Sequence, residues 1–189
     1  MPGLETPRGL IVGLTGPNAA GKGEVADYLA RRGFERHSLS DIVREEAEAR
    51  GSPPERAHLI RIGNLLRRES GAGVLGERIL PRLGRWAVVD SIRSPAEVAV
   101  LRRLPHFVLL GVRAPLGVRF TRSLERGRRG DPATLAEFEA RERQENTEDP
   151  QAQQLEATFS LADWLVDNDG NLERLHRALD DLLLDHGPE

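Results

Sequence analysis

Residues 9–29 of the chain, GLIVGLTGPNAAGKGEVADYL, contain three patterns in succession. An apolar run of strand length is followed by a glycine-flanked loop, GPNAAGKG at residues 16–23, and then by apolar residues at helical spacing. Glycines let backbone N–H groups curl around phosphate oxygens, a helix N-terminus adds partial positive charge, and Lys22 reaches the outer phosphates. The stretch predicts a strand, a phosphate-binding loop and a helix that together hold a nucleoside triphosphate. The alternative is a glycine-rich turn that contains a lysine by chance.

A second argument for Lys22 comes from composition alone. Lys22 is the only lysine of the chain, because every other one of its 27 basic residues is arginine. Basic positions in this chain have therefore become arginine in general, and position 22 is the exception. A compact ammonium group on a flexible stem suits a place between phosphates, where a planar guanidinium would not fit.

The residue after this lysine departs from the usual phosphate-loop pattern, which has Ser or Thr there to ligate Mg²⁺. Here it is Gly23, and Glu24 follows. Gly-Lys-Gly at this place resembles the adenylate-kinase branch of the nucleoside monophosphate kinases, in which a threonine usually comes next. Mg²⁺ would then be held mainly through water, by the phosphates of ATP and by Asp90, which is discussed below. The loop residues expected to bind the nucleotide are Gly16, Asn18, Ala19, Ala20, Gly21, Lys22, Gly23 and Glu24.

Length and composition limit the classes of protein to which the chain can belong. With 189 residues and a net charge of −3, we expect one domain and no general affinity for nucleic acid. The sequence has no cysteine, and its five histidines show no metal-ligand spacing. No apolar run approaches the length of a membrane span, and the first residues lack a signal pattern, so a cytoplasmic protein without membrane contacts is expected. The sequence leaves the oligomeric state open.

Apolar runs alternate with segments of helical periodicity along the chain. This alternation predicts an α/β fold, a five-stranded parallel sheet with helices on both faces and a ligand crevice outside the carboxyl ends of the strands. We expect a single domain, residues 1–189, with an acceptor-binding helical region at about 39–83 and a short lid at about 122–145. The expected strands are 10–14, 34–38, 85–90, 106–112 and 164–166. The expected helices after the first are 41–50, capped by Ser40, and 55–69, 74–83, 95–104, 115–126, 134–145 and 172–184.

The end of the second predicted strand leads into Asp41 and Arg44, which are one helical turn apart, so both side chains face the crevice. Residues 38–44, SLSDIVR, resemble the serine-x-glycine-aspartate-x-x-arginine segment of adenylate kinases, whose arginine grips the phosphate of the accepting monophosphate. The resemblance implies that Asp41 and Arg44 bind the phosphorylated acceptor. The alternative is an ion pair on a charged helix surface.

The third predicted strand ends in Asp90, at the place beside a phosphate loop where a Walker B carboxylate orients Mg²⁺ or its waters. Residues 90–94, DSIRS, resemble the aspartate-glycine-phenylalanine-proline-arginine segment of the same kinases, one residue shorter before the arginine. The resemblance implies that Asp90 is a catalytic metal ligand and that Arg93 is a second clamp on the acceptor phosphate. The alternative for Asp90 is the cap of the next helix.

An arginine-dense segment, residues 119–143, follows the fourth predicted strand, with Gly127 and Gly130 as hinges. Positioned cations stabilise the charge of a phosphoryl group in transfer, and closure of such a segment expels water. The segment resembles an abbreviated lid of the same kinase family. Four arginines are expected to serve the site, Arg122 and Arg128 in catalysis, Arg126 on the nucleotide and Arg141 on the acceptor. A solvated charged surface is the alternative.

The last predicted strand runs into residues 167–171, DNDGN, which have a turn composition. The segment around them resembles the terminal part of dephospho-coenzyme A kinases and of an archaeal family of uncharacterised P-loop kinases, where this loop lies against the donor adenine. The resemblance implies that Asn168 and Gly170 bind ATP. A plain turn with Asn171 as the helix N-cap explains the same residues without a ligand, and both interpretations stay open.

Together these segments predict a P-loop NTPase fold of the nucleoside monophosphate kinase type, with ATP and Mg²⁺ as cofactors. The leading hypothesis is transfer of the γ-phosphoryl group of ATP to a small phosphorylated acceptor, a (deoxy)nucleoside monophosphate, and dephospho-coenzyme A is the alternative acceptor. The chain is also similar to the P-loop module that precedes the zinc deaminase in some deoxycytidylate deaminases, although it lacks a zinc signature. A regulatory domain that senses nucleotide without turnover is the alternative from a different class, favoured by the missing hydroxyl at Gly23.

Overall fold

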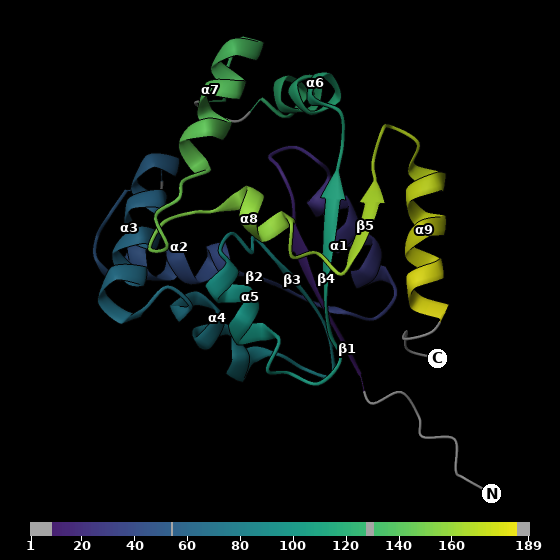
Figure 1. Ribbon diagram of the computed structural model, residues 1–189, viewed down its shortest axis with the longest axis horizontal. Coiled ribbons are helices and arrows are strands. Elements are labelled where there is room, and N and C mark those ends of the chain that lie inside the picture. The colour runs from purple at the N-terminus through teal and green to yellow at the C-terminus, as the bar shows by residue number, and fades with distance from the viewer. Residues whose placement is uncertain (1–8, 54, 128–130, 185–189) are drawn as a thin grey trace, which may run out of the picture.

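Five parallel strands form a sheet at the centre of the computed structural model, which describes residues 9–53, 55–127 and 131–184 (Figure 1). The strand order is β2-β3-β1-β4-β5. The α/β fold predicted from the sequence is confirmed. The strands are β1 (Leu10–Thr15), β2 (Glu35–Ser38), β3 (Trp86–Asp90), β4 (Phe107–Arg113) and β5 (Trp164–Asp167).

The central strand β1 is buried along its whole length, which explains why its sequence shows no polar alternation. It pairs with β3, where Val12 lies opposite Val88, and with β4, where Leu14 lies opposite Leu110. Because the paired strands all run in the same direction, the loops that follow them meet at one edge of the sheet. This edge is where the predicted site residues gather.

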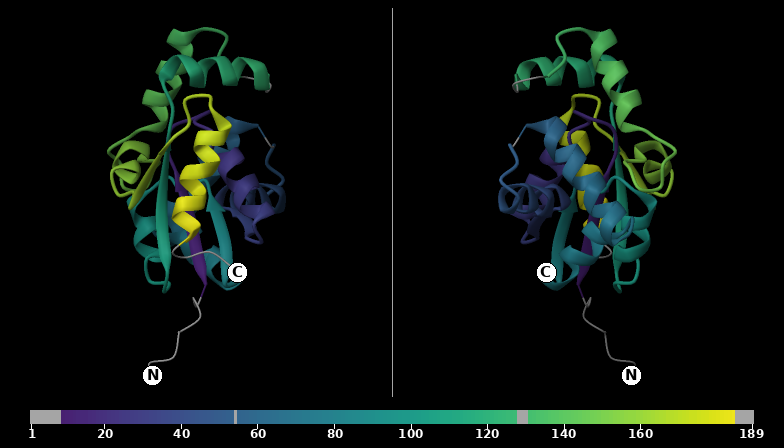
Figure 2. Two further views of the ribbon diagram at one scale, coloured as in Figure 1. Left: turned by 90° about the vertical axis from the view of Figure 1, so that its right-hand side faces the viewer. Right: turned by 90° about the vertical axis from the view of Figure 1, so that its left-hand side faces the viewer.

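Helices cover both faces of the sheet (Figures 1 and 2). On one face, Leu29 and Leu179 pack into a core with Leu14 of β1. On the other face, Ile42 and Leu66 pack into a second core with alternate residues of the same strands. The helices of the first face are α1 (Lys22–Arg31) and α9 (Leu172–Leu184). Those of the second face are α2 (Leu39–Ala49), α3 (Arg56–Ser70), α4 (Val74–Ile79) and α5 (Pro95–Leu101).

Two further helices, α6 (Leu116–Arg126) and α7 (Leu135–Glu145), lie beyond the carboxyl end of β4, at the top of Figure 1. They are held together by Phe120 and Phe138, whose rings meet edge to face with centroids 5.9 Å apart. The chain then passes through the short helix α8 (Leu155–Phe159) into β5. The sequence predicts a short lid at about residues 122–145, and the α6–α7 pair, called the lid below, occupies that place.

The start of α2 differs from the prediction. The sequence predicts Ser40 as the cap, whereas α2 begins at Leu39 and Ser38 is its N-cap residue. The hydroxyl of Ser38 lies 2.9 Å from that of Ser40 and donates to that of Ser91 at 3.1 Å. The hydroxyl groups of this turn therefore bond to one another and to the loop after β3, and they make no side-chain cap of the helix.

Other differences have local causes. The helix predicted at 74–83 ends as α4 and continues as a 3₁₀ turn, η1 (Leu80–Arg82), because Pro81 has no N–H group to donate. The fourth strand starts one residue later than predicted, since His106 has a left-handed φ of 62°. The short helix α8 is not among the predicted helices, because its five residues are too few to show helical periodicity.

Within the part of the chain that the structure describes, no helix has the length and apolarity needed to span a bilayer.

Candidate active site

The phosphate-binding loop connects β1 to α1, and its conformation depends on two glycines. Gly16 has a φ of 133°, and a Cβ atom there would lie 2.1 Å from the carbonyl oxygen of Val112. Gly21 has a φ of 99°, and a Cβ atom there would lie 1.9 Å from Nδ2 of Asn168. Ala19 between them also has a left-handed φ, of 57°. A side chain at either glycine would displace the loop from the ends of β4 and β5.

The ammonium group of Lys22 lies inside this loop. Its Nζ atom donates to the carbonyl oxygens of Gly16 at 2.7 Å and Pro17 at 2.8 Å. Burial lowers the pKa of Lys22 from 10.5 to about 8, although the carboxylate of Asp90 acts to raise it. The parallel sheet therefore brings the lysine after β1 and the aspartate at the end of β3 close enough to interact.

Asp90 sits in a tight turn. Its Oδ1 atom accepts a hydrogen bond from the backbone N–H of Ser91 at 2.6 Å, and Ser91 has a left-handed φ of 66°. The next helix, α5, is capped by Ser94, whose hydroxyl forms a capping box with Glu97. The alternative that Asp90 caps this helix is therefore wrong, and its carboxylate lies at the wall of a cavity.

The two residues after Lys22 differ in what surrounds their side-chain positions. A Cβ atom at Gly23 would meet no atom of the described residues within 4 Å, so the place of the missing hydroxyl is open space. The carboxylate of Glu24 lies 3.2 Å from Nε2 of His176 and 3.5 Å from Arg31, on the side of α9. The side chain of Glu24 is therefore occupied on the side of α9, and its backbone N–H is the group left for the predicted contact with the nucleotide.

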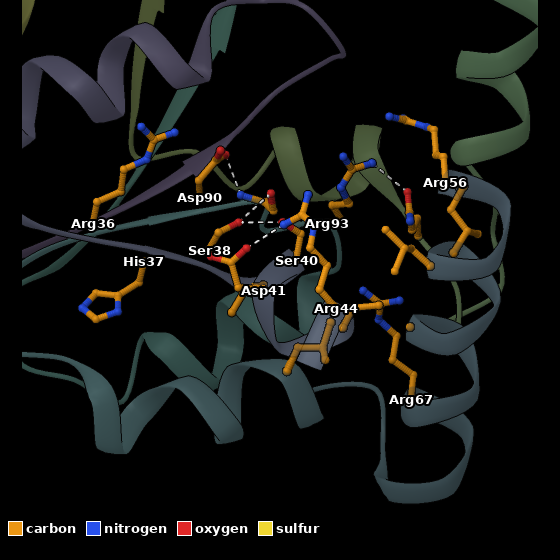
Figure 3. Close-up of a pocket in the computed structure, with 18 of the residues that line it drawn as sticks. Arg36, His37, Ser38, Ser40, Asp41, Arg44, Arg56, Arg67, Asp90 and Arg93 are labelled. Carbon is orange, nitrogen blue, oxygen red and sulfur yellow. Dashed lines mark hydrogen bonds and ion pairs between the residues drawn. The ribbon is translucent and has the colours of Figure 1, made fainter. Parts of the chain in front are cut away.

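A cavity of about 640 Å³ opens beside Asp90, between α2, α3 and the loop after β3 (Figure 3). The predicted site residues among those that line it are Asp41, Arg44, Asp90, Arg93 and Arg141. Three further arginines that the sequence did not single out line it as well, Arg36, Arg56 and Arg67. The two acceptor arginines predicted from separate segments thus share one space, and the basic wall suits an anionic ligand.

The Asp41–Arg44 pair fits both of its interpretations. Nη1 of Arg44 donates to Oδ1 of Asp41 at 2.6 Å and to the hydroxyl of Ser40 at 2.9 Å, so the ion pair exists. Both charged side chains are more than half exposed, and both line the cavity. Because an exposed ion pair contributes little to stability, an incoming phosphate can replace Asp41 as the partner of Arg44 at small cost.

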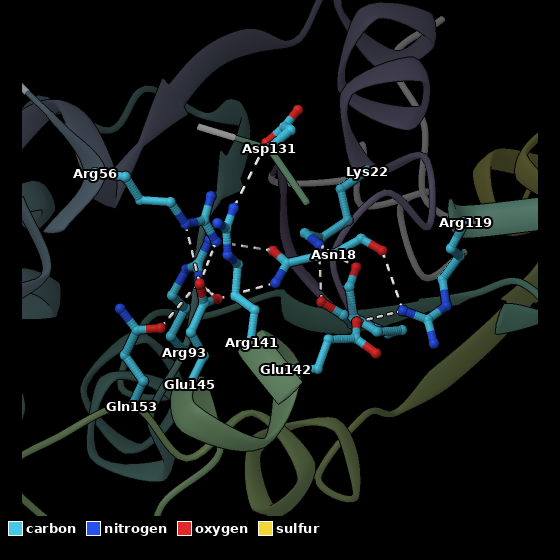
Figure 4. A network of polar contacts seen from close by, with 12 residues as sticks. Asn18, Lys22, Arg56, Arg93, Arg119, Asp131, Arg141, Glu142, Glu145 and Gln153 are labelled. Atoms are coloured by element: carbon cyan, nitrogen blue, oxygen red, sulfur yellow. Dashed lines mark hydrogen bonds and ion pairs between the residues drawn. The ribbon is translucent and has the colours of Figure 1, made fainter. Parts of the chain in front are cut away.

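A network of polar contacts joins the cavity to the lid (Figure 4). Glu145, at the end of α7, accepts hydrogen bonds from Nη2 of Arg56 at 2.5 Å and Nη1 of Arg93 at 3.2 Å. It also accepts one from Nδ2 of Asn18 in the phosphate loop at 2.9 Å. Arg93 donates in addition to Oε1 of Gln153 at 2.9 Å. Sequence reasoning missed Glu145, because no local pattern marks one charge of a polar helix as buried, and it missed Arg56, whose side chain is 40% exposed and meets Glu145 only through the tertiary fold.

Arg122 reaches the phosphate loop through Asn168. Arg122 donates to the backbone oxygen of Asn168 at 3.0 Å and to its Oδ1 at 3.1 Å, and Nδ2 of Asn168 donates to the carbonyl of Ala20 at 2.9 Å. Asn168 is only 2% exposed, so its amide supports the loop. Asn171 accepts a hydrogen bond from the backbone N–H of Arg174 at 3.1 Å, which confirms its predicted role as the cap of α9.

The other lid arginines predicted for the site gather around Asp131. Nη2 of Arg126 donates to Oδ2 of Asp131 at 3.0 Å, and Nη1 of Arg141 lies 3.8 Å from its Oδ1. Asp131 and Arg141 both line the cavity, so this pair joins the lid to the acceptor side. Arg128 lies outside the described residues. Gly170, with a φ of 119°, shapes the turn before α9.

Arg119 of α6 is a further contact between the lid and the phosphate loop. Its Nη1 atom donates to the backbone oxygen of Asn18 at 3.2 Å and to the carboxylate of Glu142 on α7. Its Nε atom donates to the carbonyl of Ala114 at 3.1 Å. Both lid helices are therefore fastened to the loop by one buried guanidinium.

The strand order, the phosphate loop and the cavity at the carboxyl ends of the strands define the fold of the P-loop kinases. No family model matches the chain. Shikimate kinase from Acinetobacter baumannii, in complex with shikimate, shares this fold with a TM-score of 0.54 over 95% of each chain and 14% sequence identity. The crystal structure of TT1252 from Thermus thermophilus is similar over 96% of this chain and 100% of its own, with a TM-score of 0.65 and 25% identity.

Sequence similarity identifies the family. A UPF0200 protein of Pyrococcus abyssi is 33% identical to this chain over 180 residues, which are 90% of this chain and 94% of the relative. The chain belongs to the UPF0200 family. The match extends over nearly the full length of both proteins, rather than over the phosphate loop alone.

Proposed function

We propose that this protein is an ATP-dependent phosphotransferase that moves the γ-phosphoryl group of ATP to a small phosphorylated acceptor. A (deoxy)nucleoside monophosphate is the favoured acceptor class, and dephospho-coenzyme A is the alternative. One observation carries the proposal. Asp90 interacts with Lys22 of the phosphate loop and also lines the cavity shared by Arg44 and Arg93. A donor phosphate chain at the loop and an acceptor phosphate on the arginines would meet at Asp90. The kinase fold of the structural neighbours supports the same class.

On the donor side, the loop N–H groups and Lys22 would hold the β- and γ-phosphates of ATP. Asp90 fits Mg²⁺, which is usually bound by one or two carboxylates together with phosphate oxygens and water. Mg²⁺, when bound, neutralises charge on the phosphates. The open space at Gly23 leaves room for a water molecule where other phosphate loops carry a hydroxyl. Arg126 and Gly170 remain the predicted contacts of the ATP nucleoside, whereas the buried amide of Asn168 is already bonded to Arg122 and Ala20.

On the acceptor side, Arg44 and Arg93 would orient the acceptor phosphate in line with the γ-phosphorus. An acceptor phosphate oxygen forms a bond to that phosphorus while the bond to the β,γ-bridging oxygen breaks, and ADP leaves with the electron pair. For a nucleoside monophosphate no general base is needed, because its phosphate is already an ionised nucleophile at neutral pH. The lid arginines that would neutralise the moving group are Arg122 and Arg128, and Arg141 would bind the acceptor.

The direct test is acceptor-dependent formation of ADP from ATP and Mg²⁺. The wild-type protein is given a panel of ribonucleoside and deoxyribonucleoside monophosphates and dephospho-coenzyme A, one at a time. We expect at least one monophosphate to raise ADP formation well above the rate without acceptor, with an equal amount of phosphorylated product. ADP formation that no acceptor changes would contradict the assignment as a transferase.

The lowered pKa of Lys22 predicts a pH dependence of nucleotide binding. Burial brings this pKa from 10.5 to about 8, so the folded protein loses the lysine proton more readily than the unfolded chain does. A neutral amine attracts phosphate less than an ammonium group does, and we expect the affinity for the unreactive analogue AMP-PNP to fall as the pH rises through about 8. By linkage, the buried lysine destabilises the fold less as the pH rises from about 8 to 10.5. Calorimetric titrations on both sides of pH 8 check the prediction, and equal affinities would contradict it.

A nucleotide-sensing domain without turnover is the second candidate. Two observations favour it: Lys22 binds carbonyls of its own loop, and Gly23 provides no hydroxyl for a metal. A sensor would bind AMP-PNP and ATP tightly and release no ADP in response to any acceptor of the panel. The same two measurements therefore separate the sensor from the kinase.

A further inference from the structure

Glu145, the last residue of α7, is a buried carboxylate that the mechanism above does not use. Its side chain is 4% exposed. Its Oε1 accepts from Nε and Nη2 of Arg56, at 3.0 and 2.5 Å. Its Oε2 accepts from Nη1 of Arg93 at 3.2 Å and from Nδ2 of Asn18 at 2.9 Å. Since Oδ1 of Asn18 also accepts from Arg56 at 3.3 Å, one carboxylate joins the phosphate loop, α3 and the loop after β3 (Figure 4).

Glu145 lies behind the cavity wall rather than in the space for a ligand. Arg56 and Arg93 line the cavity of about 640 Å³, and Glu145 is absent from the described residues that line it. An arginine has five N–H donors arranged as a fork, so it can bind a carboxylate on one edge and a phosphate on another. The acceptor phosphate and Glu145 can therefore bind the two arginines at the same time.

The charge of Glu145 is maintained by its partners. Burial acts to raise the pKa of Glu145, but the positive charges of Arg56 and Arg93 and the hydrogen bonds from Asn18 and Arg56 bring it below its usual value. The carboxylate is therefore ionised at neutral pH. Because Glu145 itself is buried, removing its arginine partners would leave its charge uncompensated, so the carboxylate and the two guanidinium groups depend on one another.

We propose that Glu145 couples the two ligand sites, as a positioning residue that aligns Arg56 and Arg93 for an acceptor phosphate and links them to the phosphate loop through Asn18. This inference rests on the proposed function of the cavity and the loop. A nucleotide that fixes the loop also fixes Asn18, and with it the carboxylate and both guanidinium groups. By reciprocity, an anion on the arginines favours the nucleotide-binding form of the loop.

The test measures this coupling with two probes that need no turnover, AMP-PNP with Mg²⁺ for the loop and inorganic phosphate for the arginines. In the wild-type protein we expect saturating AMP-PNP to tighten phosphate binding by about tenfold, and phosphate to tighten AMP-PNP binding by the same factor. Glu145→Gln keeps the size of the side chain and removes its charge, so the coupling should largely disappear. Glu139→Gln is the matched control, because Glu139 lies on the same helix and its side chain makes no ion pair or hydrogen bond with the described residues.

Several outcomes would overturn the proposal. If Glu145→Gln lowers the melting temperature and keeps the wild-type coupling, the residue is only structural. If the same variant binds phosphate more tightly without nucleotide, the carboxylate competes with phosphate instead of positioning its ligands. Absence of coupling in the wild-type protein would also refute it. A wild-type protein that shows coupling but forms no ADP with any acceptor would refute the proposed transferase function and leave this inference standing.

Discussion

Lys22→Met is expected to lower acceptor-dependent ADP formation by about 100-fold or more. Methionine has a similar length but no charge, so the loop would lose the ammonium group that interacts with Asp90 and that, on the proposed function, binds the donor phosphates. It would also lose the hydrogen bonds to the carbonyls of Gly16 and Pro17. The measurement is kcat and KM for ATP at saturating acceptor, with the melting temperature as the check that the variant is folded. Wild-type activity in Lys22→Met would contradict the role of the loop.

Lys22→Arg is the control that separates charge from shape. This change keeps the positive charge and replaces the ammonium group by the guanidinium group that every other basic residue of the chain carries. We expect it to lose most of the activity as well, since a planar guanidinium cannot take the place of the compact ammonium between the carbonyls of Gly16 and Pro17. Full activity in Lys22→Arg would show that charge alone is needed at this position.

The features that could be predicted from the sequence depend on contiguous stretches. The apolar run of β1 defines the centre of the sheet, and the glycine-lysine loop defines the donor side of the proposed site. Arg44 and Arg93 are far apart in the chain, but each follows the end of a strand, and parallel strands end at the same edge. Their shared cavity therefore follows from the topology once the strands are assigned.

The buried charges could not be predicted in this way. Glu145 belongs to a helix whose charged residues are mostly exposed, and a local sequence contains no signal for the one that tertiary packing covers. In the lid, the sequence pattern indicates the arginines, whereas the structure shows that Glu145 connects the phosphate loop to the cavity. Position along a helix determines which face a residue occupies, but only the neighbouring helices determine whether that face is buried.

The largest effect on stability is expected at the buried ion pair between Arg67 of α3 and Glu97 of α5, which are 2% and 0% exposed. Nη2 and Nε of Arg67 donate to Oε1 of Glu97 at 2.8 and 3.3 Å. Oε2 of Glu97 accepts from the backbone N–H groups of Arg93 at 2.8 Å and Ser94 at 3.1 Å. The pair therefore ties α3 to the segment that carries Arg93.

We expect Glu97→Ala to lower the free energy of unfolding by about 3–5 kcal/mol, because it leaves the guanidinium of Arg67 buried without a carboxylate. Urea unfolding at fixed pH measures this, with Glu77→Ala as the control. Glu77 pairs with Arg103 at the surface, where both side chains are about half exposed, and its loss should cost less than about 1 kcal/mol. Changing Arg67 and Glu97 together to methionine should recover part of the stability, since no buried charge is then left unpaired. If Glu97→Ala and Glu77→Ala lower the free energy of unfolding by equally small amounts, water reaches the Arg67–Glu97 pair. The orientation of Arg93 would then need another support.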